Sequence, residues 1–283
     1  MSNVDEMIAL VLKEPKQDGG EFNGFDLKGI SINGASFVYA ALLETVIDNS
    51  ELSEIDFSQA SMGKSSFKNS KIKNVSFAGA TLEDASFEGS TLMECDFKNT
   101  TLIGCDFSQS SMTKCDFQGS NLGHTSFYST TIENCNFGFA RMMYAFMKQV
   151  IINKSRLGGI NARGSDFSFS KMTEVDLKGS IFKYSDLSSC TWKDVNLTSA
   201  NMIGVDLKDA QAPGIIGEET NFEGSDLTYA NLKEANLKNA FLLEANLHGT
   251  NFSKADLSNA YLVDANIAKA VTEGANLENT ILE

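Results

Sequence analysis

The sequence contains few of the residues that carry most catalytic and metal chemistry. Its 283 residues include two histidines, one tryptophan and two prolines. His124 and His248 are far apart, and no glycine-rich phosphate loop, HExxH or GxSxG motif is present. The sequence therefore predicts no catalytic, cofactor-binding or metal-binding residue and, as a class, no enzyme.

Long apolar runs and an excess of positive charge are also missing. No run of about 18 apolar residues occurs, so no membrane span is predicted. The net charge is −14, and such a surface repels phosphates, so direct binding of nucleic acid is not expected. Asp5 and Glu6 stand where a secretory signal would be basic. We expect a cytoplasmic protein, although a secreted effector without a cleavable signal would share these features.

Large apolar residues recur at every fifth position, from Phe22 to Leu282, without a shift of phase. A second phase, two residues before each of them, holds mostly small residues, and neither phase contains Lys, Arg, Asp or Glu. Because an unpaired buried charge costs several kcal/mol, both phases are predicted to face a core. Four central positions lack a large apolar side chain: Ala162, Ala212, Gly217 and Thr272.

A period of five fits neither an α-helix nor a strand, whose periods are about 3.6 and 2 residues. It fits a chain that turns a corner every five residues, so that four sides close a square coil of about twenty residues. Successive coils would pair as parallel strands about 4.8 Å apart. The sequence thus predicts an all-β solenoid, a parallel β-helix of about 13 coils over residues 20–283.

The cysteines all fall in the small inward phase: Cys95, Cys105, Cys115, Cys135 and Cys190. Zinc needs four converging ligands, whereas Cys95 and Cys105 are predicted to lie on opposite sides of a coil. Cys95, Cys115 and Cys135 should stack at about 4.8 Å, which is at or beyond the usual range for a disulfide. We therefore predict small buried residues without a metal.

The same spacing predicts two aromatic ladders in the core. Each ladder takes one phenylalanine from successive coils, twenty residues apart. The first comprises Phe37, Phe57, Phe77, Phe97, Phe117 and Phe137, and the second Phe67, Phe87, Phe107 and Phe127.

Units such as "CDFSQ", "CDFQG", "SDLTY", "ANLKE" and "ADLSN" resemble those of the pentapeptide repeat family. The family pattern is a small residue, Asp or Asn, Leu or Phe, and two outward residues. The resemblance covers about residues 20–282. It implies a right-handed quadrilateral β-helix, and it raises the functions known in that family.

Residues 1–19 precede the repeat and carry the helical spacing Val4, Met7, Ile8, Val11 and Leu12. They predict a short N-terminal capping helix, with a docking helix for a partner as the alternative. No such helix is predicted after the last coil. Ile281 and Leu282 would cover each other in a homodimer, which is the expected route to self-association.

Two stretches depart from the pattern. Residues 139–164 keep the phase but place apolar side chains outward, which predicts either distorted coils or an inserted loop. Residues 210–221 contain Pro213, Gly214 and Gly217, and are predicted to bulge as a turn or loop. The candidate partner-binding residues are Phe139, Met143, Tyr144, Phe146, Ile151 and, in the outward column of Tyr144, His124 and Tyr184.

Three functions remain open. The first is a protein-interaction scaffold that binds an unidentified partner through its outer faces. The second is an acidic DNA mimic that binds DNA gyrase or topoisomerase IV, as the resemblance to quinolone-resistance proteins implies. Residues 61–160 weaken it, because they carry ten basic and eight acidic residues. The third is a secreted or regulatory effector that binds a host or developmental protein.

Overall fold

The computed structural model describes residues 13–282, which divide into two compact units between Arg141 and Met142. The apolar residues of the expected N-terminal helix, Val4 to Leu12, lie outside the described residues. All nine elements assigned in the described residues are three-residue β-strands.

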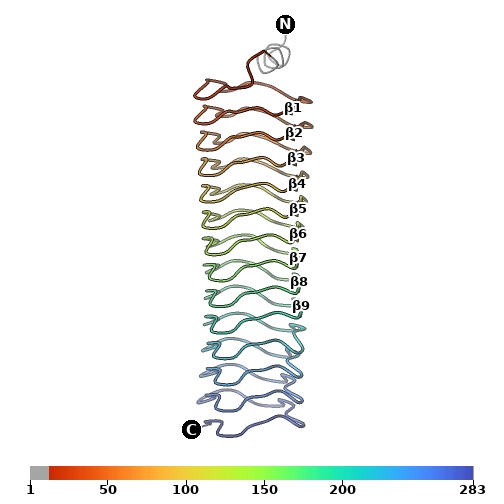
Figure 1. Ribbon diagram of the computed structural model, residues 1–283. Helices are drawn as coiled ribbons and strands as arrows, with labels where there is room; N and C mark the ends of the chain where they lie inside the picture. Colours follow the sequence, from red (N-terminus) through yellow and green to blue (C-terminus); the bar gives the residue numbers. More distant parts are fainter. Residues whose placement is uncertain (1–12, 283) are drawn as a thin grey trace. The chain divides into compact units, whose positions relative to one another are not determined.

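The strands recur at twenty-residue intervals and pair in parallel, in chain order, within each unit (Figure 1). The first unit contains β1 Ser31–Asn33, β2 Glu51–Ser53, β3 Lys71–Lys73, β4 Thr91–Met93, β5 Ser111–Thr113 and β6 Thr131–Glu133. The second contains β7 Ile151–Asn153, β8 Lys171–Thr173 and β9 Thr191–Lys193. The predicted parallel β-solenoid with about twenty residues per coil is thus confirmed.

Nine coils contain an assigned strand, one strand in each. The sequence predicts about thirteen coils. After β9 the coils continue as tight turns joined by isolated parallel bridges, as far as the pair Tyr261 and Ile281. Within each unit, each coil hydrogen-bonds to the next through its backbone. The Phe97 N–H donates to the Asp116 carbonyl at 2.7 Å, and the Asp116 N–H donates to the Cys95 carbonyl at 3.0 Å.

Most corners of the coil are four-residue turns. The Ala85 N–H donates to the Leu82 carbonyl at 3.0 Å, and Asp84, the third residue of the turn, has a φ of 57°. A positive φ at this position is that of a type II turn. A turn of this type directs its two central residues outward.

The interior confirms both predicted inward phases. Every central and small inward residue from Leu27 to Leu262 is buried. In the last described coil, after Leu262, these residues are exposed or half-buried. The two phenylalanine ladders are present: Phe97 stacks on Phe77 and Phe117 at 4.8 and 4.6 Å between ring centroids, and meets Phe87 and Phe107 edge-on at 5.8 and 6.0 Å.

Most hydroxyl groups in the small phase are accommodated because the backbone offers them acceptors; among the described residues, the buried hydroxyls of Ser65, Ser110 and Ser170 have no partner. Thr100 and Thr125 donate to the carbonyls of Phe77 and Leu102, each at 2.8 Å. A buried hydroxyl with such a partner avoids most of its desolvation cost. Serine and threonine can therefore replace alanine along these columns.

The coils around residues 210–221 do not bulge, so that prediction is wrong. The Gly214 and Gly217 N–H groups donate regularly to Lys233 and Asn236 at 2.8 and 2.7 Å. Pro213 and Gly214 occupy the two central turn positions, which suit proline and a residue of positive φ. The volume missing at Gly217 is filled by Leu237, whose Cδ2 lies 2.9 Å from the point that a Cβ on Gly217 would occupy.

Residues 142–164 also follow the regular coil. The Met142 N–H donates to Asn161, and the Leu157 N–H to Asp176, each at 2.7 Å. This part of the stretch therefore contains no inserted loop. Its apolar outward side chains stand on an ordinary backbone.

All five cysteines are buried free thiols, as predicted. Burial raises the pKa of the Cys105 and Cys190 thiols, and thiolates are the reactive form. We expect none of the five to react with Ellman's reagent in the folded protein, and all five to react in guanidinium chloride. Lys64 is exposed in the structure, so a Lys64→Cys variant provides a reactive control. Fast labelling of a native thiol would contradict the buried arrangement.

Candidate functional site

The predicted partner-binding residues all occupy exposed outward positions. In the first unit these are His124 and Phe139, the latter 71% exposed. In the second unit they are Met143, Tyr144, Phe146, Ile151 and Tyr184. The structure thus brings Tyr144 and Tyr184 into one column of the second unit, while His124 is described with the first. Whether these residues bind a partner remains a prediction.

Tyr144 and Tyr184 are held at corners of the coil. Both have positive φ, 58° and 60°, and a glycine follows each of them one coil later. A Cβ on Gly164 would lie 2.7 Å from Tyr144 Cε1, and one on Gly204 would lie 2.7 Å from Tyr184 Cδ1. The missing glycine side chains therefore make room for the two rings against the coil surface.

Sequence reasoning missed a further aromatic residue on this surface, Phe169, which is 51% exposed. It occupies the same turn position as Tyr184, so a search of the outward phases for aromatic residues would have found it. One cationic side chain lies over each of the two rings, Phe169 and Tyr184. Lys148 Nζ lies 5.4 Å from the centroid of Phe169, and Arg163 Cζ lies 5.8 Å from that of Tyr184.

A column of aspartates runs between these aromatic corners. Parallel bridges join Phe146, Asp166, Asp186, Asp206 and Asp226 in that order, one residue from each successive coil. We call the surface formed by this column together with Tyr184 and Phe169 the aspartate face. Each aspartate also stabilises its own corner: Oδ1 of Asp166 and of Asp186 accepts the N–H of Ser168 and Ser188, at 2.8 and 2.9 Å.

Among residues 13–282, lysines bridge stacked aspartates at two places. In the second unit, Lys208 Nζ lies 3.2 Å from Oδ2 of both Asp206 and Asp226. In the first unit, Lys98 Nζ lies 3.4 and 3.2 Å from Oδ2 of Asp96 and Asp116. Hydrogen bonding to these carboxylates and their negative charge raise the pKa of both lysines. These lysines neutralise part of the acidic surface.

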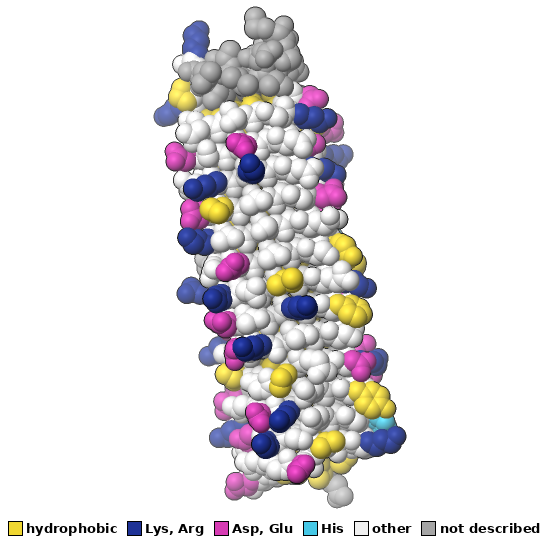
Figure 2. Space-filling model, turned by 90° about the vertical axis from the view of Figure 1, so that its right-hand side faces the viewer, with side chains coloured by type: hydrophobic (Ala, Val, Ile, Leu, Met, Phe, Trp, Pro, Cys, Tyr) yellow, Lys and Arg dark blue, Asp and Glu magenta, His cyan; other side chains and the backbone are white. Residues whose placement is uncertain are grey.

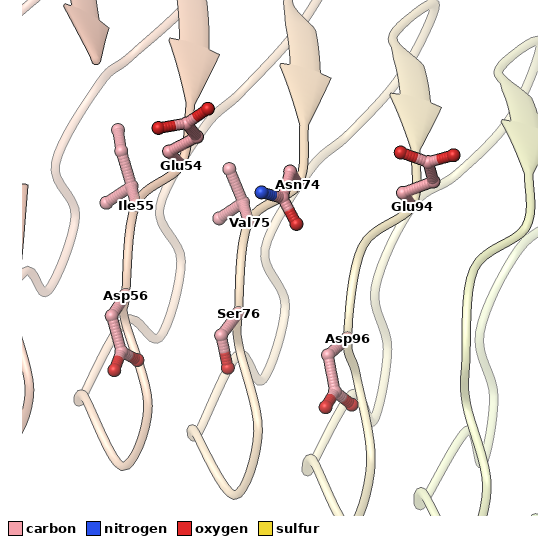
Figure 3. A pocket seen from close by; sticks show the side chains of 8 residues that line it. All are labelled: Glu54, Ile55, Asp56, Asn74, Val75, Ser76, Glu94 and Asp96. Carbon is pink, nitrogen blue, oxygen red and sulfur yellow. The ribbon is translucent and has the colours of Figure 1, made fainter. Parts of the chain in front are cut away.

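A second acidic feature lies in the first unit, in a hollow of about 310 Å³. Figure 3 shows Glu54 and Glu94 on either side of the shorter Asn74, and Asp56 and Asp96 on either side of Ser76. Glu94 and Asp96 pair with lysines. Nowhere in residues 13–282 do three or more metal-ligating side chains gather as a metal would require.

The face shown in Figure 2 carries side chains of both charges. On the face shown in Figure 2, acidic, basic and hydrophobic side chains alternate, and no continuous acidic strip is visible. A DNA mimic would need such a strip, because duplex DNA carries about one charge per 1.7 Å along its axis.

The last described coil leaves apolar side chains uncovered. Phe252, Leu257, Leu262 and Leu282 are among the residues around a hollow of about 260 Å³. Ile281 is also exposed. Self-association through Ile281 and Leu282 remains a prediction.

Within the described residues, we find no helix with the length and apolar character needed to cross a membrane.

Comparison with protein families gives two matching models, both described as pentapeptide repeats. One matches residues 90–127, 180–214, 218–242 and 245–283, and the other matches residues 47–91. No curated protein matches the sequence.

Several solved structures are similar. HetL, a pentapeptide repeat protein involved in heterocyst differentiation regulation in Nostoc sp. strain PCC 7120, is 20% identical over all of this chain and 97% of its own, with a TM-score of 0.42. A trypsin-treated variant of QnrB1, a plasmid-mediated fluoroquinolone resistance protein, is 15% identical over 73% of this chain and 91% of its own, with a TM-score of 0.29. Rfr23 from Cyanothece 51142 is 23% identical over 47% of this chain and 91% of its own, with a TM-score of 0.27.

Proposed function

Because the chain belongs to the pentapeptide repeat family, we propose that it is a non-enzymatic protein that binds a partner protein through the outer faces of its coils. The partner contacts centre on the second unit. Its interior is filled by side chains, so binding takes place on the outside of the coil.

The observation that carries this proposal is the exposure of aromatic side chains that the core does not need. Tyr184 and Phe169 are 61% and 51% exposed, although every inward position around them is already occupied. Burying one such side chain contributes about 1.5–3 kcal/mol. Soluble proteins that expose apolar patches commonly use them for binding.

Removing these two rings should abolish partner capture and leave the fold intact. We expect a Tyr184→Ser and Phe169→Ser variant to lose a discrete protein that the wild type retains from a lysate of its source cells. Both positions are outward, so the thermal midpoint should change little. Quantitative mass spectrometry of the captured proteins measures the effect.

Ile216→Ser is the matched control, since Ile216 is 45% exposed in the same unit but lies on another side of the coil. It should capture the partner at the wild-type level. Equal capture by all three proteins would contradict binding at the aspartate face.

DNA mimicry receives less support from the surface. The lysine bridges on Asp96 and Asp116, and on Asp206 and Asp226, neutralise the stacked carboxylates that a mimic would present. The mixed charges of the face in Figure 2 point the same way. We therefore favour a partner that recognises aromatic and charged side chains together.

A further inference from the structure

Outward apolar side chains of the second unit gather on one side of its coils. Parallel bridges join Ile181, Asn201, Asn221, Phe241 and Tyr261 in that order, one residue from each successive coil. The isoleucine and the two rings are 37%, 38% and 38% exposed. The Phe241 and Tyr261 rings stack with their centroids 5.1 Å apart. We call this side, made of the bridged column and the turn residues that follow it in each coil, the lateral face.

Charged turn residues stand at the two ends of the lateral face. Arg163 and Lys183 lie toward its N-terminal end, and Glu244 and Asp264 lie toward its C-terminal end. Lys183 is half-buried, and the other three side chains are exposed. Of the ion pairs formed among residues 13–282, none involves these four side chains. The face is therefore positive at one end and negative at the other.

These charges are arranged symmetrically about the middle of the face, which lies between the coils of Asn201 and Asn221. Lys183 lies one coil before Asn201, and Glu244 lies one coil after Asn221. The outer cation and the outer anion each lie one coil further out. Because the coils stack at a constant spacing of about 4.8 Å, each cation is as far from the middle as its matching anion.

This symmetry suits a second copy of the same face. A two-fold axis through the middle, perpendicular to the coil axis, places the copies antiparallel. It brings Lys183 of each copy beside Glu244 of the other, and Arg163 beside Asp264. Glu223 lies one coil nearer the middle than Glu244 and adds negative charge next to the same lysine. An axis parallel to the coils would instead set Lys183 level with Lys183 of the second copy, so the charges select the antiparallel pair.

The uncharged side chains match under the same operation. Ile181 of one copy faces Phe241 of the other, and the two middle asparagines face each other, where their amides can exchange hydrogen bonds. At the far corner of this side, Lys178 would face Lys238. Both lysines are exposed, so their repulsion at the rim contributes little.

We propose that the second unit forms an antiparallel homodimer through the lateral face. This inference goes beyond the binding of another protein. The column of Asp166 and Asp186 lies on the next side of the coil, where the dimer leaves it accessible. A second copy is the occupant that the charges fit, because a partner of one charge would be repelled at one end of the face. Burial of Ile181 and of the two stacked rings provides the apolar part of the contact.

Exchanging two charges tests both the face and its orientation. Lys183→Glu and Glu244→Lys should each weaken the dimer about tenfold, because each homodimer would contain two like-charge contacts. An equimolar mixture of the two variants should regain the wild-type affinity. In the mixed dimer, residue 183 of each chain again meets the opposite charge at residue 244 of the other. Sedimentation equilibrium at low ionic strength measures the dissociation constants.

Removing the two stacked rings tests the apolar part of the contact. A variant with both Phe241→Ser and Tyr261→Ser should weaken the dimer by about tenfold or more, since it removes most of the apolar area at one end of the face. Tyr229→Ser is the matched control, because Tyr229 is 55% exposed in the same unit but lies on another side of the coil. It should associate like the wild type.

Three results would overturn the lateral dimer. The first is a wild-type protein that stays monomeric at every concentration tested. The second is a mixture of the two charge variants that associates no more tightly than each variant by itself. The third is a dimer that Leu282→Asp dissociates while the lateral variants leave it intact, which would locate self-association at the last described coil. Binding of another protein is judged separately, by capture with the Tyr184 and Phe169 variant, so each proposal can fail without the other.

Discussion

Phe97→Ala is expected to lower the free energy of unfolding of the first unit by about 3–5 kcal/mol. Phe97 is fully buried and contacts four other rings: Phe77, Phe87, Phe107 and Phe117. Alanine would leave a cavity and interrupt one ladder while removing two edge-on pairs with the other. Urea denaturation followed by circular dichroism measures the change.

Phe139→Ala in the same unit provides the control for this substitution. Phe139 is 71% exposed, so its truncation should change stability by no more than about 0.5 kcal/mol. Each coil contacts mainly its neighbours, so we expect amide hydrogen exchange in Phe97→Ala to accelerate most between residues 77 and 117. Equal stability of the two variants would contradict a continuous aromatic core.

Ala212→Leu is expected to destabilise the second unit by about 1–3 kcal/mol through overpacking. Ala212 follows Trp192 by one coil in the same inward column, and both side chains are buried. The small residue offers room beside the largest side chain of the core. Adding Trp192→Leu should therefore recover much of the loss.

The recovery can be measured as the coupling energy of a double-mutant cycle, for which we expect about 1–2 kcal/mol. The Trp192→Leu single variant also removes a buried indole N–H that has no hydrogen-bond partner among the described residues. The pair Leu247→Ala and Ala212→Leu serves as an uncoupled control. Strict additivity of the Trp192 and Ala212 changes would show that the two side chains do not share a volume.

The fold could be predicted from the sequence because each inward residue repeats the same physical requirement. Phe97 and Cys95 each belong to an inward phase from which charged residues are absent throughout. Because this absence repeats in every coil, a few unusual residues do not obscure the pattern. The predicted bulge at residues 210–221 shows where single residues mislead. Pro213 and Gly214 usually indicate a loop, but in a chain made of corners they fit an ordinary corner.

The candidate site was only partly predictable, because it depends on relations between coils. The apolar outward residues such as Tyr184 stood out by phase alone. The lysine bridges did not, since they depend on a lysine, a preceding aspartate and another aspartate one coil later. Phe169 was overlooked because it lies outside the stretch that the sequence marks as irregular.

Because the coil has four sides of five residues each, the side on which an outward residue lies depends on the number of residues before it. Inserting or deleting five residues, for example between Ser189 and Val205, would leave every inward position inward and the core intact. It would also move Asp206 and the residues after it to the next side of the coil, and so separate Lys208 and Asp206 from the column of Asp186. A change of twenty residues would restore the column. Selection on such a protein can therefore act on length in two separate ways: steps of five redistribute its binding surfaces, and steps of twenty lengthen them.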